Sequence, residues 1–382
     1  MTVPGAPDSR SYEYARLPED LLADLLADTP QVSRQVLDLM SPALEQRDQL
    51  RTAAEHLGLV EQVTPGSPAT VCAVDGGFAV ERTIAVDIAM AVAVGVEGFA
   101  DHGRPPAWDD NQYASFHKVL LHNLHNERLA RAATHAHEVA ILADAPHDLR
   151  IYDGSHLTPV IQLNSGLSSE YDDVSGLAAD VCTEVELVDA LQAFTENPAI
   201  IAMPKYDSSR EVCKQLEGKV GHRVPGDDKY VTSLILHGSE FIVPFQVSGP
   251  EWPQLHIAAK PHTRADVSGI PKALDEKLKP LRQRELQVTY WRPDDVSPAY
   301  RIEMKPALAR HPRALSTAFS TLAAQITGPF VREPYPQYLA DVMAKSVGLG
   351  LAALQTSAQL ALSRDHPDLA QLLMHSYRTE GR

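Results

Sequence analysis

Cysteine is scarce in this chain, and its spacing excludes two kinds of stabilising framework. Only Cys72, Cys182 and Cys213 occur among 382 residues, an odd number without a CxxC pair. A disulfide scaffold and a structural zinc site both need more cysteines at closer spacing. We therefore expect three reduced thiols in a cytoplasmic protein.

The chain also lacks a long uninterrupted apolar run. The longest candidate extends from Ile84 to Val96, is interrupted by Asp87, and falls short of the roughly 18 residues that a membrane span needs. Residues 1–19 contain no apolar core behind a basic start, so no secretory signal is expected. These absences predict a protein without membrane insertion.

Positive charge is the third deficit. The chain has 34 Lys and Arg against 50 Asp and Glu, a formal net charge of −16, and an acidic surface repels a polyanion. The charge is uneven, because residues 260–313 carry twelve Lys/Arg against seven Asp/Glu, a local net of +5. That stretch is either a DNA-tracking surface or an ordinary solvated face. Composition alone argues against a simple basic nucleic-acid binder.

Two short β-rich segments are each followed by an aspartate and a glycine. They are Val71-Cys72-Ala73-Val74-Asp75-Gly76-Gly77 and Leu149-Arg150-Ile151-Tyr152-Asp153-Gly154-Ser155. We expect each acid at the end of a strand, at the rim of a sheet beside a glycine turn. Because Asp-Gly is also a common turn dipeptide, each could be a turn and nothing more. Together they suggest two acids that meet over one metal site.

A helix predicted over about residues 111–143 lies between the two segments and could add a third acid. Glu127 and Glu138 are eleven residues apart, close to three helical turns, so both would project from one face. Carboxylates from two strands and one helix suit two-metal phosphodiester hydrolysis, in which Mg²⁺ or Mn²⁺ ions lie about 4 Å apart. The histidines of this segment show no HExxH pattern, so we expect solvent or packing roles for them.

The rest of the pattern predicts an N-terminal arm and helices followed by a β-rich core with helices. The arm is expected at 1–17, helices at 18–26, 31–59, 177–195, 313–327 and 334–363, strands at 70–75, 83–96, 148–153, 199–203, 230–236, 240–247, 255–259, 286–291 and 300–304, and an exposed loop or flap at 214–229.

The order of several short motifs resembles the NurA nuclease family. The family pattern is matched by Ala73-Val74-Asp75-Gly76-Gly77, Ile151-Tyr152-Asp153-Gly154-Ser155, Ile201-Ala202-Met203-Pro204-Lys205-Tyr206-Asp207-Ser208-Ser209 and Pro334-Tyr335-Pro336-Gln337-Tyr338-Leu339-Ala340. Asp227-Asp228-Lys229-Tyr230-Val231 stands where the family has an acidic stretch before a strand. Each motif is short, and their joint order extends from about residue 71 to residue 345.

The resemblance implies an α/β fold with an RNase H-like mixed central sheet, flanking helices and an N-terminal helical extension. It divides the chain into the arm and extension at 1–63, a nuclease domain at 64–345 and a helical tail at 346–382. It also implies a Mn²⁺- or Mg²⁺-dependent DNA end-processing nuclease, a homodimer docked on a HerA-like hexameric ATPase in DNA repair or anti-phage defence.

By the same resemblance Asp75, Glu138 and Asp153 are the metal ligands, and Tyr335 matches the family tyrosine. Glu138 is preferred to Glu127 because it lies 15 residues before Asp153, near the family spacing, whereas Glu127 lies 26 before it.

The chain departs from the family pattern at two positions. Gly77 replaces a serine, and Met343 stands where the family helix usually has a histidine. Methionine cannot bind a hard ion or relay a proton, so Asp341 is the candidate substitute. The alternative functions are a catalytically weakened adaptor that regulates the translocase, or another RNase H-like enzyme such as an RNA-processing nuclease.

Several polar residues have two readings each. Lys205 with Ser208, Ser209 and Arg210 could clamp a phosphate, or form a polar turn after a strand. Glu303 could face the site from another strand, but we expect a surface glutamate.

Overall fold

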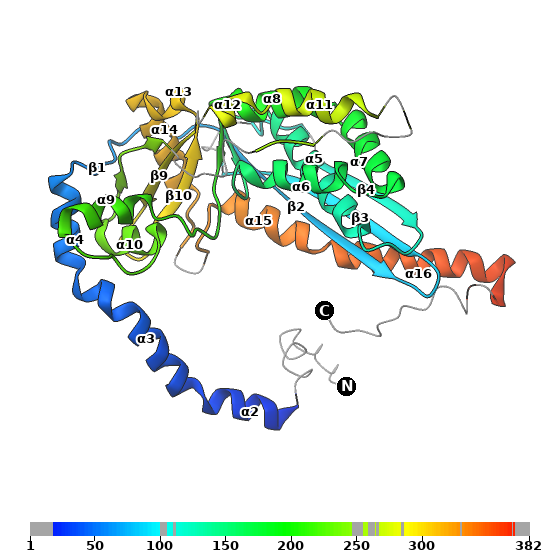
Figure 1. The fold of residues 1–382 in the computed structure, drawn as a ribbon, viewed down its shortest axis with the longest axis horizontal. Helices are drawn as coiled ribbons and strands as arrows, with labels where there is room; N and C mark the ends of the chain where they lie inside the picture. Colours follow the sequence, from blue (N-terminus) through cyan, green and yellow to red (C-terminus); the bar gives the residue numbers. More distant parts are fainter. Residues whose placement is uncertain are drawn as a thin grey trace, which may run out of the picture.

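One mixed sheet with helices on both faces forms the body of the protein (Figure 1). The computed structural model describes residues 18–99, 105–109, 112–246, 255–258, 264, 267–283, 286–328, 331–368 and 370. The arm predicted over residues 1–17 lies outside the described part. No helix in the described ranges has both the length and the apolar character that crossing a membrane requires.

Among the described residues the sheet has ten strands in the order β1-β7-β9-β10-β6-β5-β2-β3-β4, with β8 paired to β9. An antiparallel meander of β2, β3 and β4 is followed by β5 and β6, which run parallel to β2. The strands are β1 Val60–Gln62, β2 Val71–Arg82, β3 Asp87–Glu97, β4 Gln112–Leu120, β5 Leu149–Tyr152, β6 Ile200–Ala202, β7 Glu240–Ile242, β8 Phe245–Gln246, β9 Gln287–Arg292 and β10 Tyr300–Met304.

Helices α5 to α8 cover one face of the sheet, and α14, α15 and α16 cover the other (Figure 1). The predicted fold class, a mixed central sheet with flanking helices and an N-terminal helical extension, is confirmed. The helices are α2 Glu19–Ala27, α3 Thr29–Glu45, α4 Arg47–His56, α5 Asn126–Asp144, α6 Leu157–Leu167, α7 Asp172–Glu184, α8 Leu187–Glu196, α9 Glu211–Val220, α10 Asp228–Ile235, α11 Gly269–Glu276, α12 Lys279–Arg282, α13 Pro306–Ala309, α14 Pro312–Ala324, α15 Tyr335–Lys345 and α16 Val347–Asp365.

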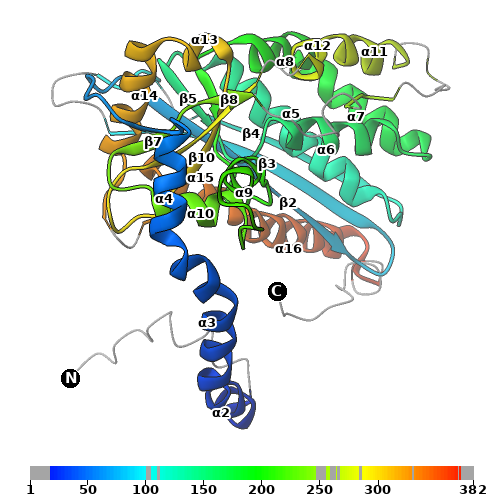
Figure 2. The same ribbon diagram turned by 60° about the vertical axis from the view of Figure 1, so that its left-hand side comes forward.

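Helices α2 and α3 project away from the body, and Figure 2 shows them below the sheet. Helix α2 has no buried residue and α3 has one, Ala43. Apolar side chains such as Leu25, Val36 and Leu39 are exposed along them. The single helix expected over residues 31–59 is broken at Gln46, and α4 begins at the next residue, Arg47, and packs on α9 and α10.

The predicted strand end at Asp75 is wrong, because β2 continues through it for seven more residues to Arg82. Gly76 and Gly77 are not in a turn; they pair with Ala93 and Val92 of β3. Helices approach β2 on both faces here. A Cβ on Gly76 would lie 2.5 Å from Glu138 Oε1 of α5, and a Cβ on Gly77 would lie 2.3 Å from the Ala344 carbonyl oxygen of α15. The glycines are required by close packing.

We expect Gly77→Ser to lower the free energy of unfolding by about 1–3 kcal/mol, since its Cβ would overlap backbone that has to move. Urea unfolding measures the change. Gly348→Ser is the matched control, because a Cβ there has nothing within 4 Å. Equal stability of the two variants would contradict this account of why Gly77 departs from the family serine.

Four other predicted elements are wrong in whole or in part. The helix expected over residues 111–143 begins only at Asn126; Gln112–Leu120 is edge strand β4, which pairs with β3 along most of its length. The strand expected at 230–236 is helix α10, whose N-cap Asp227 accepts a hydrogen bond from Tyr230 N. The loop expected at 214–229 contains most of α9. Residues 255–258 of another expected strand form none.

Two predicted helices are each interrupted once. The helix over residues 177–195 is divided into α7 and α8 at Glu186, which has a left-handed backbone with φ 50°. The helix over 334–363 is divided at Ser346 into α15 and α16. The strand expected at 300–304 is present with these bounds. The other expected strands, at 83–96, 148–153, 199–203, 240–247 and 286–291, are present with shifts at their ends, and 240–247 is divided into β7 and β8. The three cysteines are free and buried.

Candidate metal centre

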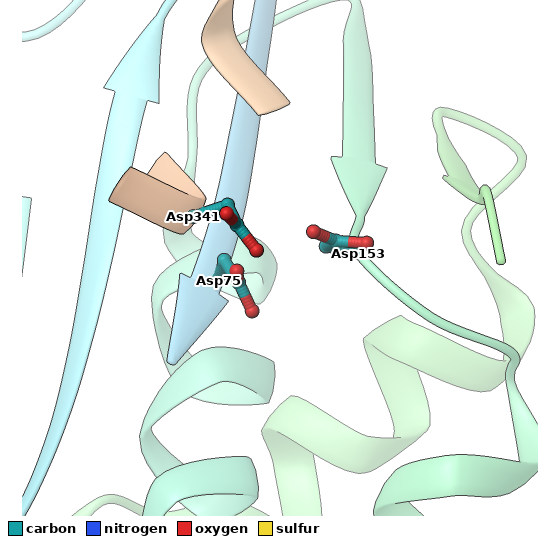
Figure 3. Close-up of side chains that lie close together, drawn as sticks. All are labelled: Asp75, Asp153 and Asp341. Atoms are coloured by element: carbon teal, nitrogen blue, oxygen red, sulfur yellow. The ribbon is translucent and has the colours of Figure 1, made fainter. Parts of the chain in front are cut away.

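Three aspartates converge at the edge where β2 and β5 separate (Figure 3). Asp75 lies in β2, Asp153 directly follows β5, and Asp341 is on α15. One carboxylate oxygen from each lies within 4.8 Å of the others. Carboxylate oxygens in such a group suit a hard divalent cation such as Mg²⁺ or Mn²⁺.

The alternation of side chains along two parallel strands explains the position of the first two acids. Val74 pairs with Tyr152, and both side chains pack into the core on the α5 face. Because successive strand residues point to opposite faces, the next residue of each segment, Asp75 and Asp153, faces α15. Helix α15 packs on that face and carries Asp341, whose carboxylate lies near those of the other two acids.

Burial and electrostatic repulsion between the carboxylates raise the pKa values of Asp75 and Asp153. Burial, together with the charges of Asp153 and Glu138, raises the pKa of Asp75 to about 8. The hydrogen bond that Asp75 Oδ1 accepts from Gly76 N at 2.8 Å opposes this rise. Burial also raises the pKa of Asp153, although Lys205 opposes this. The site therefore concentrates negative charge that a cation would stabilise.

Lys205 supplies the positive charge in this cluster. Its Nζ lies 2.8 Å from Asp153 Oδ2, 2.5 Å from Asp341 Oδ1 and 3.5 Å from Glu333 Oε2. Burial would lower the pKa of Lys205, but these carboxylates raise it, so the ammonium stays charged. Glu333, two residues before Tyr335, was not anticipated from the sequence.

The residues fit a bound divalent cation. Within the described residues Asp153 Oδ2 is buried and accepts no hydrogen bond of good geometry, so its nearest partner is the Lys205 charge. Asp153 Oδ1 accepts a hydrogen bond from Gln337 Nε2 at 3.0 Å, and Gln337 also donates to the Met203 carbonyl. Gln337 is buried on α15 and fixes the orientation of Asp153. The sequence signal for it was its place in the Tyr-Pro segment.

Glu138 lies close to Asp75 but on the other side of β2. It is buried on α5, fills the space that the missing side chain of Gly76 leaves, and accepts a hydrogen bond from the Tyr152 hydroxyl at 3.0 Å. His135 Nδ1 is 2.5 Å from the same oxygen of Glu138. The carboxylate that joins Asp75 and Asp153 within 4.8 Å is that of Asp341.

Glu127, the other helical candidate, is exposed in the first turn of α5 and pairs with Arg131 at 2.5 Å. The structure therefore brings only Glu138 of these two glutamates close to Asp75. On α15, Met343 is exposed, whereas Asp341 lies one half turn earlier and faces the acids. The ring of Tyr335 stacks on Phe99 with centroids 4.3 Å apart.

Of the four residues predicted to clamp a phosphate, Lys205 alone contacts the acids. Arg210 pairs with Glu217 at 2.5 Å and donates to the Val224 carbonyl, so its charge serves the loop after α9. Ser209 contacts Arg301, and Ser208 is exposed. This arrangement holds the segment after β6 in place.

The expectation that Glu303 lies on the surface is wrong. It is fully buried on β10 and accepts hydrogen bonds from Ser155 Oγ at 3.0 Å, His156 N at 2.8 Å and Arg301 Nη2 at 2.9 Å. Burial would raise the pKa of Glu303, but the hydrogen bond from His156 and the charge of Arg301 lower it to about 2. Because Ser155 lies two residues after Asp153, this network anchors the loop that carries Asp153. Elsewhere in the basic stretch, Arg292 donates to backbone carbonyls, and residues 260–263, 265–266 and 284–285 lie outside the described part.

The raised pKa of Asp75 predicts that metal binding releases a proton. Metal binding needs the carboxylate, so between about pH 6 and pH 8 affinity should increase with pH. In the metal-free protein the free energy of unfolding changes in the opposite direction with pH. The native state holds a proton on Asp75 that the unfolded chain loses near about pH 4. Asp75 therefore destabilises the fold increasingly as pH rises toward about 8. Calorimetric titration of Mn²⁺ in buffers of different ionisation enthalpy measures the released proton. Glu61→Gln on β1 is the control, and its Mn²⁺ affinity should depend on pH as that of the wild type does. A wild-type Mn²⁺ affinity that is independent of pH would contradict the prediction.

Comparison with known proteins gives matches in structure and none in sequence. No family model matches, and no curated protein matches. The crystal structure of the NurA nuclease from Sulfolobus solfataricus is similar over 91% of this chain and 98% of that chain, with a TM-score of 0.55 and 12% identity. NurA with manganese covers 87% of this chain and 98% of its own, with a TM-score of 0.50 and 11% identity. NurA bound to dAMP and manganese covers 82% and 92%, also with a TM-score of 0.50 and 11% identity.

This likeness extends over most of each chain and identifies the fold as NurA-like. The fold implied by the motifs is therefore confirmed, although the identities are low. Two of the matched structures contain manganese, and the three aspartates form a possible metal-binding group in the corresponding fold.

Proposed function

On the premise of this NurA-like fold, we propose that the chain is a metal-dependent DNA nuclease that hydrolyses phosphodiester bonds. The observation that carries the proposal is the convergence of Asp75, Asp153 and Asp341 on one point at the sheet edge. A fold shared with NurA nucleases supports DNA as the substrate.

In the proposed site Asp75, Asp153 and Asp341 hold Mn²⁺ or Mg²⁺, and Glu138 supports them from the other face of β2. When bound, the metal supplies Lewis-acid activation of water and charge stabilisation. Gln337 and the Glu303 network orient Asp153. Lys205 is placed to attract a phosphate oxygen to the same point, as a point charge. We propose two-metal hydrolysis as the reaction type. Tyr335, whose ring stacks on Phe99, has a supporting role in this proposal.

The biological setting belongs to the same proposal. An acidic chain binds free DNA poorly, so a HerA-like hexameric ATPase that feeds DNA ends to a homodimer of this chain, in the cytoplasm, fits its net charge of −16. The exposed apolar side chains of α2 and α3 are the surface that we assign to contact with the ATPase. The divisions at residues 64 and 346 separate this extension and α16 from the nuclease domain. We propose DNA repair or anti-phage defence as the process that this end processing serves.

One assay tests the activity. Linear labelled single- and double-stranded DNA is incubated with the chain in Mn²⁺, Mg²⁺ or EDTA, beside Asp153→Ala, with and without the ATPase. We expect the wild type to cleave DNA in Mn²⁺ or Mg²⁺ and not in EDTA, and we expect Asp153→Ala not to cleave it. Absence of cleavage in all conditions, or equal cleavage by the variant, would refute the nuclease and favour the adaptor for which Met343 is the sequence argument. Cleavage of RNA and not of DNA would favour the RNA-processing alternative.

A further inference from the structure

Tyr206 is a large aromatic side chain that the fold presents to solvent beside the candidate metal centre. Tyr206 is 93% exposed, more than any other large apolar or aromatic residue among the described residues. It directly follows Lys205, whose ammonium contacts Asp153 and Asp341. Since consecutive Cα atoms lie about 3.8 Å apart, the backbone of Tyr206 is fixed next to that of the lysine which contacts these two acids.

The backbone on both sides of Tyr206 is fixed by buried contacts. On one side Lys205 is held by its carboxylates, and its carbonyl accepts a hydrogen bond from Lys229 Nζ at 2.7 Å. On the other side Asp207 accepts hydrogen bonds from Arg301 Nη1 at 2.7 Å and from the Tyr290 hydroxyl. Both Arg301 and Tyr290 are buried. The exposed ring therefore stands on a backbone that is already ordered.

An exposed ring on an ordered backbone suits stacking on a nucleobase. Tyrosine has few rotatable bonds, so little conformational entropy is lost when its ring is immobilised. Every base has a π-face, and stacking on an aromatic side chain is tolerant of sequence. A base inside a duplex has both faces covered by its neighbours, whereas an unpaired base has a face available. The position of Tyr206 thus favours an unpaired nucleotide whose adjacent phosphate reaches Lys205.

We propose that Tyr206 is a base-stacking residue that selects single-stranded DNA ends for the metal centre. The proposal rests on the proposed nuclease function, and deepens it by naming the substrate class. Lys205 and Tyr206 would contact one nucleotide through its phosphate and its base respectively. The chain gains this preference without a basic surface, which agrees with its acidic composition.

Equilibrium binding tests the proposal separately from cleavage. Fluorescence anisotropy of a labelled oligothymidylate and of a labelled blunt hairpin duplex is measured in Ca²⁺ in place of Mn²⁺, with the full chain. Tyr206→Ala should weaken binding of the single strand between about fivefold and about a hundredfold and leave duplex affinity unchanged. Tyr206→Phe keeps the ring and should retain single-strand affinity.

Tyr171→Ala is the matched control. Tyr171 is also exposed, but it precedes α7 on the α5 face of the sheet, away from Asp75. We expect it to bind both probes as the wild type does. Wild-type affinity of Tyr206→Ala for the single strand, or an equal loss for strand and duplex, would overturn the stacking role. Wild type that binds neither probe would also overturn the selection of single strands, whereas the nuclease itself is refuted only by absence of cleavage in every arm of the DNA assay.

Discussion

Asp75→Asn is expected to reduce metal-dependent cleavage by more than about a hundredfold while making the metal-free protein more stable. Even the partners of metal ligands typically contribute tenfold to a hundredfold, so the loss of a ligand carboxylate should exceed that. Asparagine keeps the size of the side chain and an oxygen for the Gly76 amide, but removes the charge that burial, Asp153 and Glu138 oppose. A destabilising group retained at one point is typical of functional sites.

Two measurements separate these effects. At pH 8 the thermal unfolding midpoint of metal-free Asp75→Asn should lie a few degrees above that of the wild type, and the rise on adding Mn²⁺ should disappear. Glu127→Gln is the control, because Glu127 is exposed and pairs only with Arg131 among the contacts that the structure describes. A less stable Asp75→Asn that still responds to Mn²⁺ would show that Asp75 has a structural role.

The sequence predicted the acids of this site better than it predicted their backbone. Asp153 does follow a strand, because Ile151-Tyr152 is a short β-branched and aromatic run beside β2. Asp75 does not end one. The glycines that suggested a turn are required by α5 and α15, whose contacting residues are far away in the chain: Glu138 lies 62 residues after Gly76, and Ala344 lies 267 residues after Gly77. Local sequence carries no record of such tertiary contacts.

The errors in secondary structure have similar causes. Asp228–Ile235 is a short β-branched run that periodicity alone cannot distinguish from a strand, and its N-cap Asp227 decides in favour of a helix. Gln112–Leu120 resembled a helix start, but it is an edge strand because β3 offers it a partner over nine residues. Glu303 appeared to be a surface residue because its three partners come from the loop after β5 and from β10.

The third acid could be named from chemistry but not placed. Methionine at 343 excluded the family histidine, and Asp341 was the nearest group with a hard oxygen. Whether it reached the site depended on the rotation of α15, which is fixed by the approach of Ala344 to Gly77 and by the hydrogen bond from Gln337 to Asp153. These contacts turn Asp341 toward Asp75 and leave Met343 exposed.

Lys205→Met is expected to bind Mn²⁺ about tenfold more tightly than the wild type and yet to cleave DNA more slowly. The ammonium of Lys205 holds the oxygens of Asp153 and Asp341 that a metal needs, so the two cations compete and repel each other. Methionine keeps the length of the side chain without its charge. Cleavage falls because the phosphate loses its positive partner. Calorimetric titration of Mn²⁺ and single-turnover cleavage separate binding from chemistry.

Lys345→Met is the matched control for this competition. Lys345 also pairs with Asp341, at 2.6 Å, but its side chain is 74% exposed, where an ion pair contributes little. Its removal should change Mn²⁺ affinity much less than removal of Lys205. If Lys205→Met binds Mn²⁺ more weakly than the wild type, the ammonium orders the carboxylates before the metal arrives and does not compete with it. The sign of the change in affinity therefore decides between an internal cation that the metal displaces and one that prepares its site.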